Sequence, residues 1–138
     1  MPGKAANSER TYRVFISHAT YDKWVATVLC EKIEMLGATT FRDDRDIAGG
    51  DSIPEAIQFE IRDSDEVLVL LSPQSLKRQW IYIEIGMAVA FQKRIVPLMF
   101  HIPAKQIPDI IRNQRGFDLD NFDGYLADVA ARVASFRS

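Results

Sequence analysis

The sequence predicts an α/β domain, in which a parallel β-sheet carries helices on both of its faces. Along 138 residues, short runs rich in β-branched and aromatic residues alternate with helical patterns four or five times. One of these runs, residues 66–71 (EVLVLL), is apolar without interruption after its first residue, which is typical of a central strand covered on both sides. The connections are short, and short connections between alternating strands and helices favour a parallel sheet.

The composition fits a single globular domain. Hydrophobic residues make up 47% of the chain and charged residues 26%, which is enough for an ordinary core. Lysine and arginine total 17 against 19 aspartates and glutamates, so the formal net charge is −2, with both signs interspersed. No stretch resembles a polybasic arm, so nucleic acid is not an expected partner. We expect residues 1–10, which are polar and lack periodicity, to be a flexible lead-in and residues 11–138 to form the domain.

The sequence favours a soluble, cytoplasmic protein. Cys30 is the single cysteine, so no internal disulfide can form, and its place in an apolar helical pattern indicates a core residue in a reducing compartment. The polar first ten residues do not form a signal peptide, and no apolar run reaches the roughly 18–20 residues that a membrane span needs. Without a cluster of cysteine and histidine, we expect no metal site, and we expect no membrane partner.

The first half of the chain predicts two strands and a helix. Residues 12–17 (YRVFIS) form the first strand, and residues 38–41 form the second. The helix between them begins near Thr20, with Thr20 or Asp22 as a possible cap, and ends at Gly37. Its apolar residues recur at helical spacing: Val25, Val28, Leu29, Ile33 and Leu36.

A polar loop and another helix follow the second strand. The loop, RDDRDIAGGD, contains Gly49 and Gly50, which can adopt backbone angles closed to other residues, so we expect it to be exposed and mobile. Ser52 to Glu55 has the form of a capping box. The helix that it starts carries Ile57 and Ile61 on one face and ends at residues 64–65.

After the central strand, the sequence predicts a third helix, two further strands and a last helix. The third helix begins between Ser75 and Trp80, and residues 94–100 form the fourth strand, where Pro97 indicates a bulge or a strand end. An irregular connection then leads through a helical turn near Ile110 to a small edge strand at residues 117–119. The last helix, capped by Asp120 or Asn121, has one apolar stripe: Phe122, Leu126, Val129 and Val133.

Glu84 is the one carboxylate in residues 80–91 (WIYIEIGMAVAF), an otherwise uncharged and mostly apolar run. A buried carboxylate without a partner costs several kcal/mol, so the chain must pair it, expose it or use it. Trp80 shares a face with Glu84 at either helical or strand spacing, so the indole lies beside the carboxylate in both cases. The plainer alternative is that Glu84 reaches solvent or pairs with Arg78, while Trp80 is an ordinary core residue.

Three polar segments follow strands of the predicted sheet. Residues 17–20 follow the first strand, residues 42–50 the second, and residues 72–84 the third. Ligands of such sheets bind outside the carboxyl ends of the strands, so these segments predict a cleft with Glu84 at one wall. The chain has no glycine-rich dinucleotide motif, no phosphate-binding loop and no zinc motif.

Four segments in this order resemble the Toll/interleukin-1 receptor (TIR) domain of bacterial type: YRVFISHATYD, FRDDRDIAGGDSI, DEVLVLLSPQSL and WIYIE. The resemblance covers about residues 11–134. It implies a flavodoxin-like fold, a three-layer sandwich with a five-stranded parallel sheet in the order 2-1-3-4-5. It also matches residues 42–50 to the mobile BB loop of the family. Other TIR domains are therefore expected partners, with assembly into a homo-oligomer on activation.

The resemblance implies one of two functions. Many members cleave NAD⁺ at the nicotinamide–ribose bond, giving nicotinamide and ADP-ribose or a cyclic isomer, often in bacterial immune signalling or cell-suicide defence. Their catalytic glutamate closes a W-x-x-x-E motif, which here ends at Glu84, so NAD⁺ is expected as substrate and no cofactor is expected. Other members are scaffolds that act only by TIR–TIR association and commonly lack this glutamate.

Position in the family motifs implies roles for five further residues. Ser17 and His18 would line the nicotinamide or ribose side, Asp43 and Asp46 would contact the nucleotide or hold the BB loop, and Trp80 would supply an apolar wall. His18 is alternatively a plain loop residue, and the loop charges are alternatively a solvated cluster.

Two other kinds of protein share features with this chain. A phosphoacceptor receiver domain has the same sheet order, but it needs acidic residues after the first strand and a phosphorylatable aspartate after the third. This chain has Ser17-His18 and Ser72-Pro73 there. A nucleoside deoxyribosyltransferase, which also sets a carboxylate at a ribose carbon, is the closer enzymatic rival.

Overall fold

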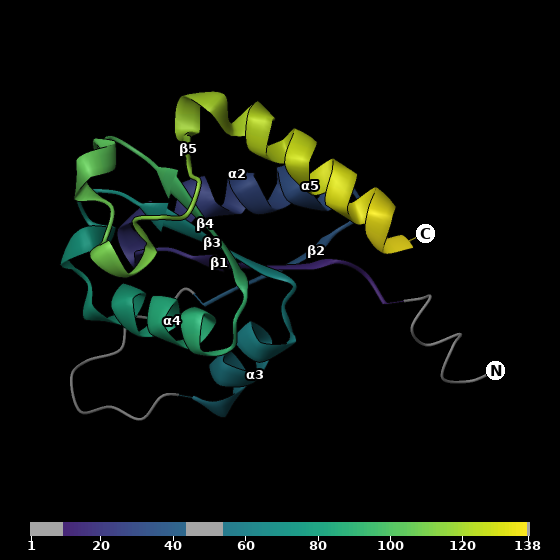
Figure 1. The fold of residues 1–138 in the computed structure, drawn as a ribbon, viewed down its shortest axis with the longest axis horizontal. Helices are drawn as coiled ribbons and strands as arrows, with labels where there is room; N and C mark the ends of the chain where they lie inside the picture. Colours follow the sequence, from purple (N-terminus) through teal and green to yellow (C-terminus); the bar gives the residue numbers. More distant parts are fainter. Residues whose placement is uncertain (1–9, 44–53, 138) are drawn as a thin grey trace.

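A computed structural model describes residues 10–43 and 54–137. It contains a five-stranded parallel sheet in the order β2-β1-β3-β4-β5, which confirms the predicted fold and strand order (Figure 1). Each predicted strand is present with ends within one residue of the prediction. The strands are β1 (Arg13–Ser17), β2 (Thr39–Arg42), β3 (Glu66–Leu71), β4 (Arg94–Met99) and β5 (Phe117–Asp118).

Four α-helices cover the two faces of the sheet in the described part of the chain. Helices α2 and α5 lie on one face, and α3 and α4 lie on the other (Figure 1). Their bounds are α2 (Lys23–Glu34), α3 (Glu55–Asp63), α4 (Gln79–Ala90) and α5 (Phe122–Arg137). Short 3₁₀ turns join them: η1 (Thr20–Asp22), η2 (Ser75–Lys77), η3 (Ala104–Gln106), η4 (Asp109–Ile111) and η5 (Leu119–Asn121).

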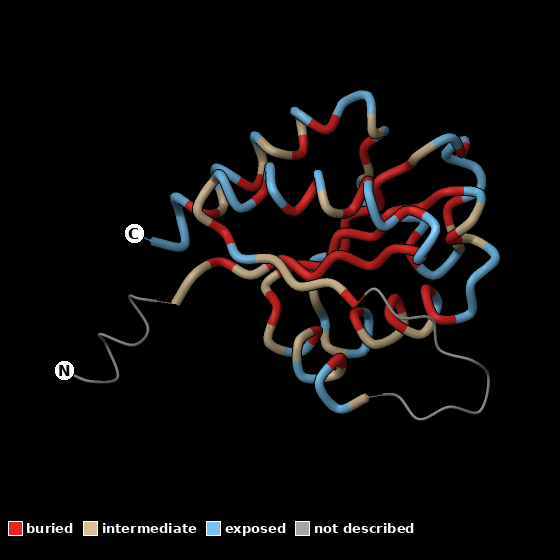
Figure 2. Tube along the Cα trace, turned by 180° about the vertical axis from the view of Figure 1, so that it is seen from behind, coloured by how far each residue is buried: buried red, intermediate tan, exposed pale blue. Residues whose placement is uncertain are grey.

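The uninterrupted apolar pattern of β3 follows from its central position. Leu68 and Leu70 point into the core under α2 and α5, whereas Val67, Val69 and Leu71 point into the core under α3 and α4. Side chains alternate between the two faces of a strand. Helices cover both faces of β3, so none of its side chains reaches solvent and none has to be polar for that reason. Figure 2 shows the buried strands as a continuous band between the two helical layers.

Pro97 does not cause a bulge or end the strand, so that prediction was wrong. It lies within β4, and the register with β3 continues through it from Val69 opposite Pro97 to Leu71 opposite Met99. The backbone of Gly116 lies against the Pro97 carbonyl, because a Cβ at Gly116 would come within 2.7 Å of that oxygen. Pro97 therefore turns its hydrogen-less nitrogen toward this edge, where pairing with β5 begins only at Leu98.

Several expectations fall at the limits of the described residues. Ser52 of the predicted capping box and most of the glycine-containing loop lie outside them, and α3 begins directly after Pro54. The lead-in also lies outside, except for Arg10, whose guanidinium contacts Asp65 and the Phe136 ring. Cys30 is buried in the core, as predicted. No helix among residues 10–43 and 54–137 is long and apolar enough to span a bilayer.

A fully buried carboxylate, Glu66, links β3 to the N-terminal segment and to α5. The hydroxyls of Tyr12 and Tyr125 donate to it at 2.5 and 2.6 Å. Arg132 of α5 donates from Nε at 2.8 Å and from Nη2 at 3.3 Å. Burial, together with the negative charge of Glu66, raises the pKa of both tyrosines, so both hydroxyls stay protonated and remain donors.

Replacing Tyr125 by Phe should destabilise the protein through this network. The substitution keeps the ring that packs edge-on against Phe117 but leaves one oxygen of Glu66 with a single long hydrogen bond. Hydrogen bonds to charged groups contribute about 1.5–3 kcal/mol, so the free energy of unfolding in urea should fall by about that amount.

Tyr82→Phe is the matched control, because the Tyr82 hydroxyl donates to a backbone carbonyl at an exposed site. Its loss should stay below about 1 kcal/mol. Equal losses in the two variants would show that the Glu66 network does not carry the stability assigned to it.

Candidate active site

Glu84 lies on the buried stripe of α4. Residues 80, 81, 84, 85 and 88 recur at helical spacing, and all five are buried where the helix meets the sheet. The helix period therefore places the one charged side chain of α4 on its inner face, where Glu84 is only 1% exposed. The alternative of a solvent-exposed glutamate is excluded.

Ser17 is the hydrogen-bond partner of Glu84. It is the last residue of β1, which lies between β2 and β3, and it is fully buried. Its hydroxyl donates to Glu84 Oε1 at 2.5 Å. Two residues that are 67 positions apart in the sequence thus meet where the carboxyl end of a central strand faces a covering helix. The alternative pairing with Arg78 is not among the contacts of Glu84 in the described part of the chain.

Burial dominates the electrostatics of Glu84 and raises its pKa from 4.5 to about 8. The hydrogen bond from Ser17 opposes this shift, the negative charge of Asp43 adds to it, and the nearby indole N–H of Trp80 slightly favours the ionised form. Among residues 10–43 and 54–137, no cationic side chain contributes to the shift. The carboxyl group is therefore mostly protonated at neutral pH in this conformation.

Four of the other predicted site residues lie in the described part of the chain, and all four are buried. Trp80 lies one turn before Glu84, as predicted, and its Nε1 makes no hydrogen bond of ordinary geometry with a described residue. Asp43 directly follows β2. His18 directly follows Ser17, and its Nδ1 is 2.7 Å from the carbonyl oxygen of Ala19, which orients the ring. Asp46 lies outside the described residues.

A second polar cluster near this site was not predicted. Asp22, one of the two residues predicted to cap α2, occupies its N-cap position, but its buried side chain makes no capping hydrogen bond, so the predicted role of that side chain was wrong. Its carboxylate accepts a hydrogen bond from the hydroxyl of Ser72 at 2.5 Å. Ser72 and Ser75 also exchange backbone-to-hydroxyl bonds of 2.8 and 3.0 Å. The cluster ties the end of β3 to the segment that follows Ser17; a serine on each side of Pro73-Gln74 was its only sequence signal.

This arrangement offers a buried, ionisable carboxyl group. Among residues 10–43 and 54–137, no cluster of three or more His, Cys, Asp or Glu side chains is placed to hold a metal ion. A carboxyl group in a low-dielectric setting interacts strongly with any positive charge that develops nearby, because little water screens it. In its ionised form, Glu84 is therefore suited to stabilise a cationic transition state.

The raised pKa predicts that stability depends on pH. Between about pH 4.5 and 8 the folded protein keeps a proton on Glu84 that the unfolded chain releases, so raising the pH favours unfolding. Relative to Glu84→Gln, the wild-type free energy of unfolding should fall by up to about 1.4 kcal/mol per pH unit in this range. Urea titrations of both proteins at a series of pH values measure this difference. A difference that stays constant with pH would contradict the assignment.

Comparisons with known proteins point to one family. A family model described as "TIR domain" matches residues 14–132. The chain is 29% identical over 135 residues to a probable 2′ cyclic ADP-D-ribose synthase of Brachypodium distachyon, covering 93% of this chain and 60% of that protein. It is 31% identical over 111 residues to a 2′ cyclic ADP-D-ribose synthase of Acinetobacter baumannii, covering 77% and 41%.

The fold is also similar to that of solved structures. It superposes on the crystal structure of the TIR domain of a Toll-related receptor from Hydra magnipapillata with a TM-score of 0.67 and 25% identity, covering 93% of this chain and all of that one. The chain spans 60% and 41% of the lengths of the plant and bacterial relatives. The four sequence segments, the strand order and the matched range agree, and the chain belongs to the TIR domain family.

Proposed function

We propose that this TIR domain is an enzyme that cleaves the nicotinamide–ribose bond of NAD⁺, releasing nicotinamide and ADP-ribose or a cyclic ADP-ribose isomer. The observation that carries the proposal is the buried carboxyl group of Glu84, which lies at the carboxyl end of the sheet and accepts a hydrogen bond from one neutral donor among the described residues, Ser17. The names of the plant and bacterial relatives, both 2′ cyclic ADP-D-ribose synthases, support it.

One carboxylate is sufficient for this reaction. As the C–N bond breaks, its electron pair leaves with nicotinamide, which departs as a neutral molecule and needs no general acid. Positive charge builds on the ribose ring, and the ionised Glu84 stabilises it. Water or a hydroxyl group of the same ADP-ribose then forms the new bond at the ribose carbon and loses a proton. The first route gives ADP-ribose, and the second gives a cyclic isomer.

Bound NAD⁺ would bring a positive charge and hydrogen-bond donors to Glu84. Nicotinamide in NAD⁺ carries a positive charge, and the ribose hydroxyls are hydrogen-bond donors, so a bound substrate lowers the pKa of Glu84 toward the ionised form. The protonated, buried state then describes the protein without substrate. Reaching the carboxylate requires the site to open, and we assign that opening to assembly with other TIR domains into a homo-oligomer in the cytoplasm, within bacterial immune signalling or cell-suicide defence.

The neighbours of Glu84 have supporting roles in this proposal. Ser17 orients the carboxyl group, and Trp80 excludes water, which strengthens the interaction between the carboxylate and the ribose cation. His18 lines the nicotinamide or ribose side. Asp43 and Asp46 contact the nucleotide or hold the loop that follows β2.

Replacing Glu84 by Gln should abolish most activity while preserving the fold. The amide keeps the shape and can still accept from Ser17, but it carries no charge. The rate of NAD⁺ cleavage should fall by about 100-fold or more, which is on the order of 3 kcal/mol of lost transition-state stabilisation. Chromatography of nicotinamide and ADP-ribose products after incubation with NAD⁺ measures the rate.

Glu31→Gln is the matched control, because it makes the same chemical change at an exposed position of α2 and should leave the rate unchanged. A folded Glu84→Gln protein that cleaves NAD⁺ at the wild-type rate would rule out the catalytic assignment. A wild-type protein that is assembled yet inert toward NAD⁺ would instead establish a scaffold.

The rate of NAD⁺ cleavage should also rise more steeply than in direct proportion to the protein concentration. If contacts between TIR domains complete the site, the fraction of competent sites increases as monomers assemble. Specific activity measured across the concentration range in which light scattering detects assembly tests this dependence. Specific activity that is constant over that range would show that the monomer is already competent.

A further inference from the structure

A cavity of about 260 Å³ lies at the amino end of β4. Ser17, by contrast, lies at the carboxyl end of β1. The cavity is bounded by the start of β4, the segment before β5 and the middle of α5. Its polar lining residues are Arg94, Gln114, Arg115, Asp128 and Arg132. Three guanidinium groups and one carboxylate thus line one small cavity, which the proposed cleavage of NAD⁺ does not use.

Arg132 is held in a fixed orientation at the back of this cavity. Its Nε and Nη2 donate to the two oxygens of Glu66, so one edge of the guanidinium is occupied. Its Nη1 has no hydrogen-bond partner among the described residues, although the side chain is only 22% exposed. Glu66 is already saturated by Arg132 and by the hydroxyls of Tyr12 and Tyr125, so it has no free capacity for a further cation.

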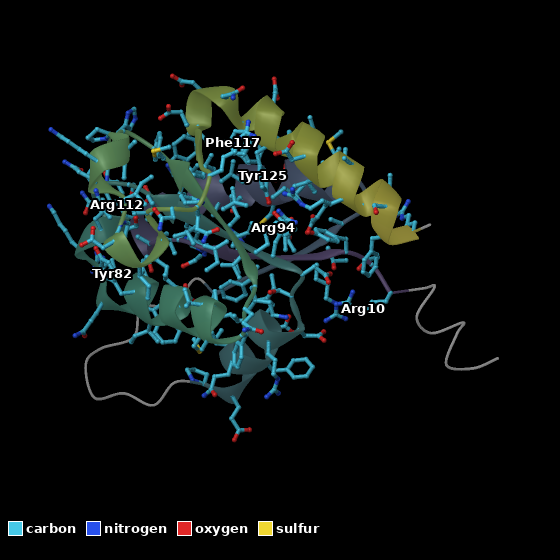
Figure 3. The ribbon with its side chains drawn as sticks, viewed as in Figure 1. Arg10, Tyr82, Arg94, Arg112, Phe117 and Tyr125 are labelled. Carbon is cyan, nitrogen blue, oxygen red and sulfur yellow. The ribbon has the colours of Figure 1, made fainter. Side chains whose placement is uncertain are left out.

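The other two arginines lie at the mouth of the cavity. Arg94 stands directly beside Glu66 in the register of β3 and β4, on the face that α5 covers, and Figure 3 shows it on the same side as Phe117 and Tyr125. Arg115 stacks over the Phe117 ring at 5.6 Å, which restrains its guanidinium. Neither Arg94 nor Arg115 forms an ion pair with another described residue.

The charges and the size define the class of ligand. Three guanidinium groups exceed the two nearby carboxylates, Asp128 and Glu66, by one positive charge. Arg94 and Arg115 are exposed, and solvent screening is weakened only toward the back of the cavity, where Arg132 is partly buried. Guanidinium groups match the geometry of phosphate oxygens and bind them through paired hydrogen bonds. The volume is below the roughly 300–1,000 Å³ of pockets for drug-sized ligands, so it suits a phosphate or diphosphate group rather than a whole dinucleotide.

From this geometry we infer that the cavity formed by Arg94, Arg115 and Arg132 is a binding site for a phosphoryl group, separate from the Glu84 site. The group is a free phosphate or diphosphate, or the phosphate of a small sugar phosphate. Arg132 provides the preoriented donor at the back of the cavity, and Arg94 and Arg115 close on the ligand from the mouth. Binding here stabilises the contact of α5 with β3 and β4, because Arg132 joins the ligand to Glu66.

A titration followed by amide NMR tests the site on the full chain. Inorganic phosphate, pyrophosphate and ribose 5-phosphate are added separately at constant ionic strength, and shifts are expected at residues 94–96, 114–117 and around Arg132. Tighter binding of the inorganic ions identifies free phosphate as the ligand chemistry, and tighter binding of ribose 5-phosphate identifies a sugar phosphate. Arg94→Gln and Arg115→Gln should each weaken the binding about 10-fold or more.

Arg112→Gln is the control, because Arg112 is an exposed arginine nearby in the sequence that pairs with Asp109 and does not line the cavity. It should leave the affinity unchanged. Shifts that are absent at millimolar ligand, that spread over all basic surface residues, or that weaken equally in the Arg112→Gln protein would overturn the inference. Because the readout is binding rather than turnover, the outcome is independent of whether the protein cleaves NAD⁺.

Discussion

The hydrogen bond between Ser17 and the buried carboxyl group of Glu84 is the contact on which the candidate site depends. Removing a carboxylate from water costs far more than one neutral donor returns, so the group remains mostly protonated while the site is closed. A neutral carboxyl group is tolerated in the core without a cation beside it. The fold therefore holds a mostly neutral, ionisable carboxyl group beneath α4.

The two buried glutamates, Glu66 on β3 and Glu84 on α4, have very different surroundings. Glu66 accepts four hydrogen bonds, two of them from a guanidinium group, and its partners come from two distant segments of the chain, the residue before β1 and helix α5. Such a network stabilises one arrangement and leaves the Glu66 carboxylate no capacity to accept from a ligand. Within the part of the chain that the structure describes, Glu84 accepts one hydrogen bond and contacts no cation, so the cost of burying its charge is only partly offset. An incompletely satisfied buried group of this kind is typical of a functional site.

The sequence predicted much of the fold because its signals are local. The β3 run is apolar on both faces, and the stripe of Trp80, Glu84 and their neighbours follows the helix period, so both were readable from spacing alone. Two predictions failed where a distant segment decided the outcome. Pro97 stays within β4 because Gly116 and the late start of β5 leave its nitrogen without a required partner. Asp22 occupies the N-cap position of α2, but its carboxylate does not cap the helix, because Ser72, fifty positions away, offers it a buried donor.

The sequence by itself determined the order of strands and helices, the faces that they bury and the position of one carboxylate within an apolar helix. These follow from periods of two and 3.6 residues, which relate only near neighbours in the chain. The tertiary structure alone decided which donors meet each carboxylate: Ser17 for Glu84, 67 positions away, and Tyr12, Tyr125 and Arg132 for Glu66, 54 to 66 positions away. Such partners are set by strand order and by the packing of helices across the sheet. The pKa of Glu84, and with it the chemistry that the site can perform, follows from burial that exists only once the chain has folded.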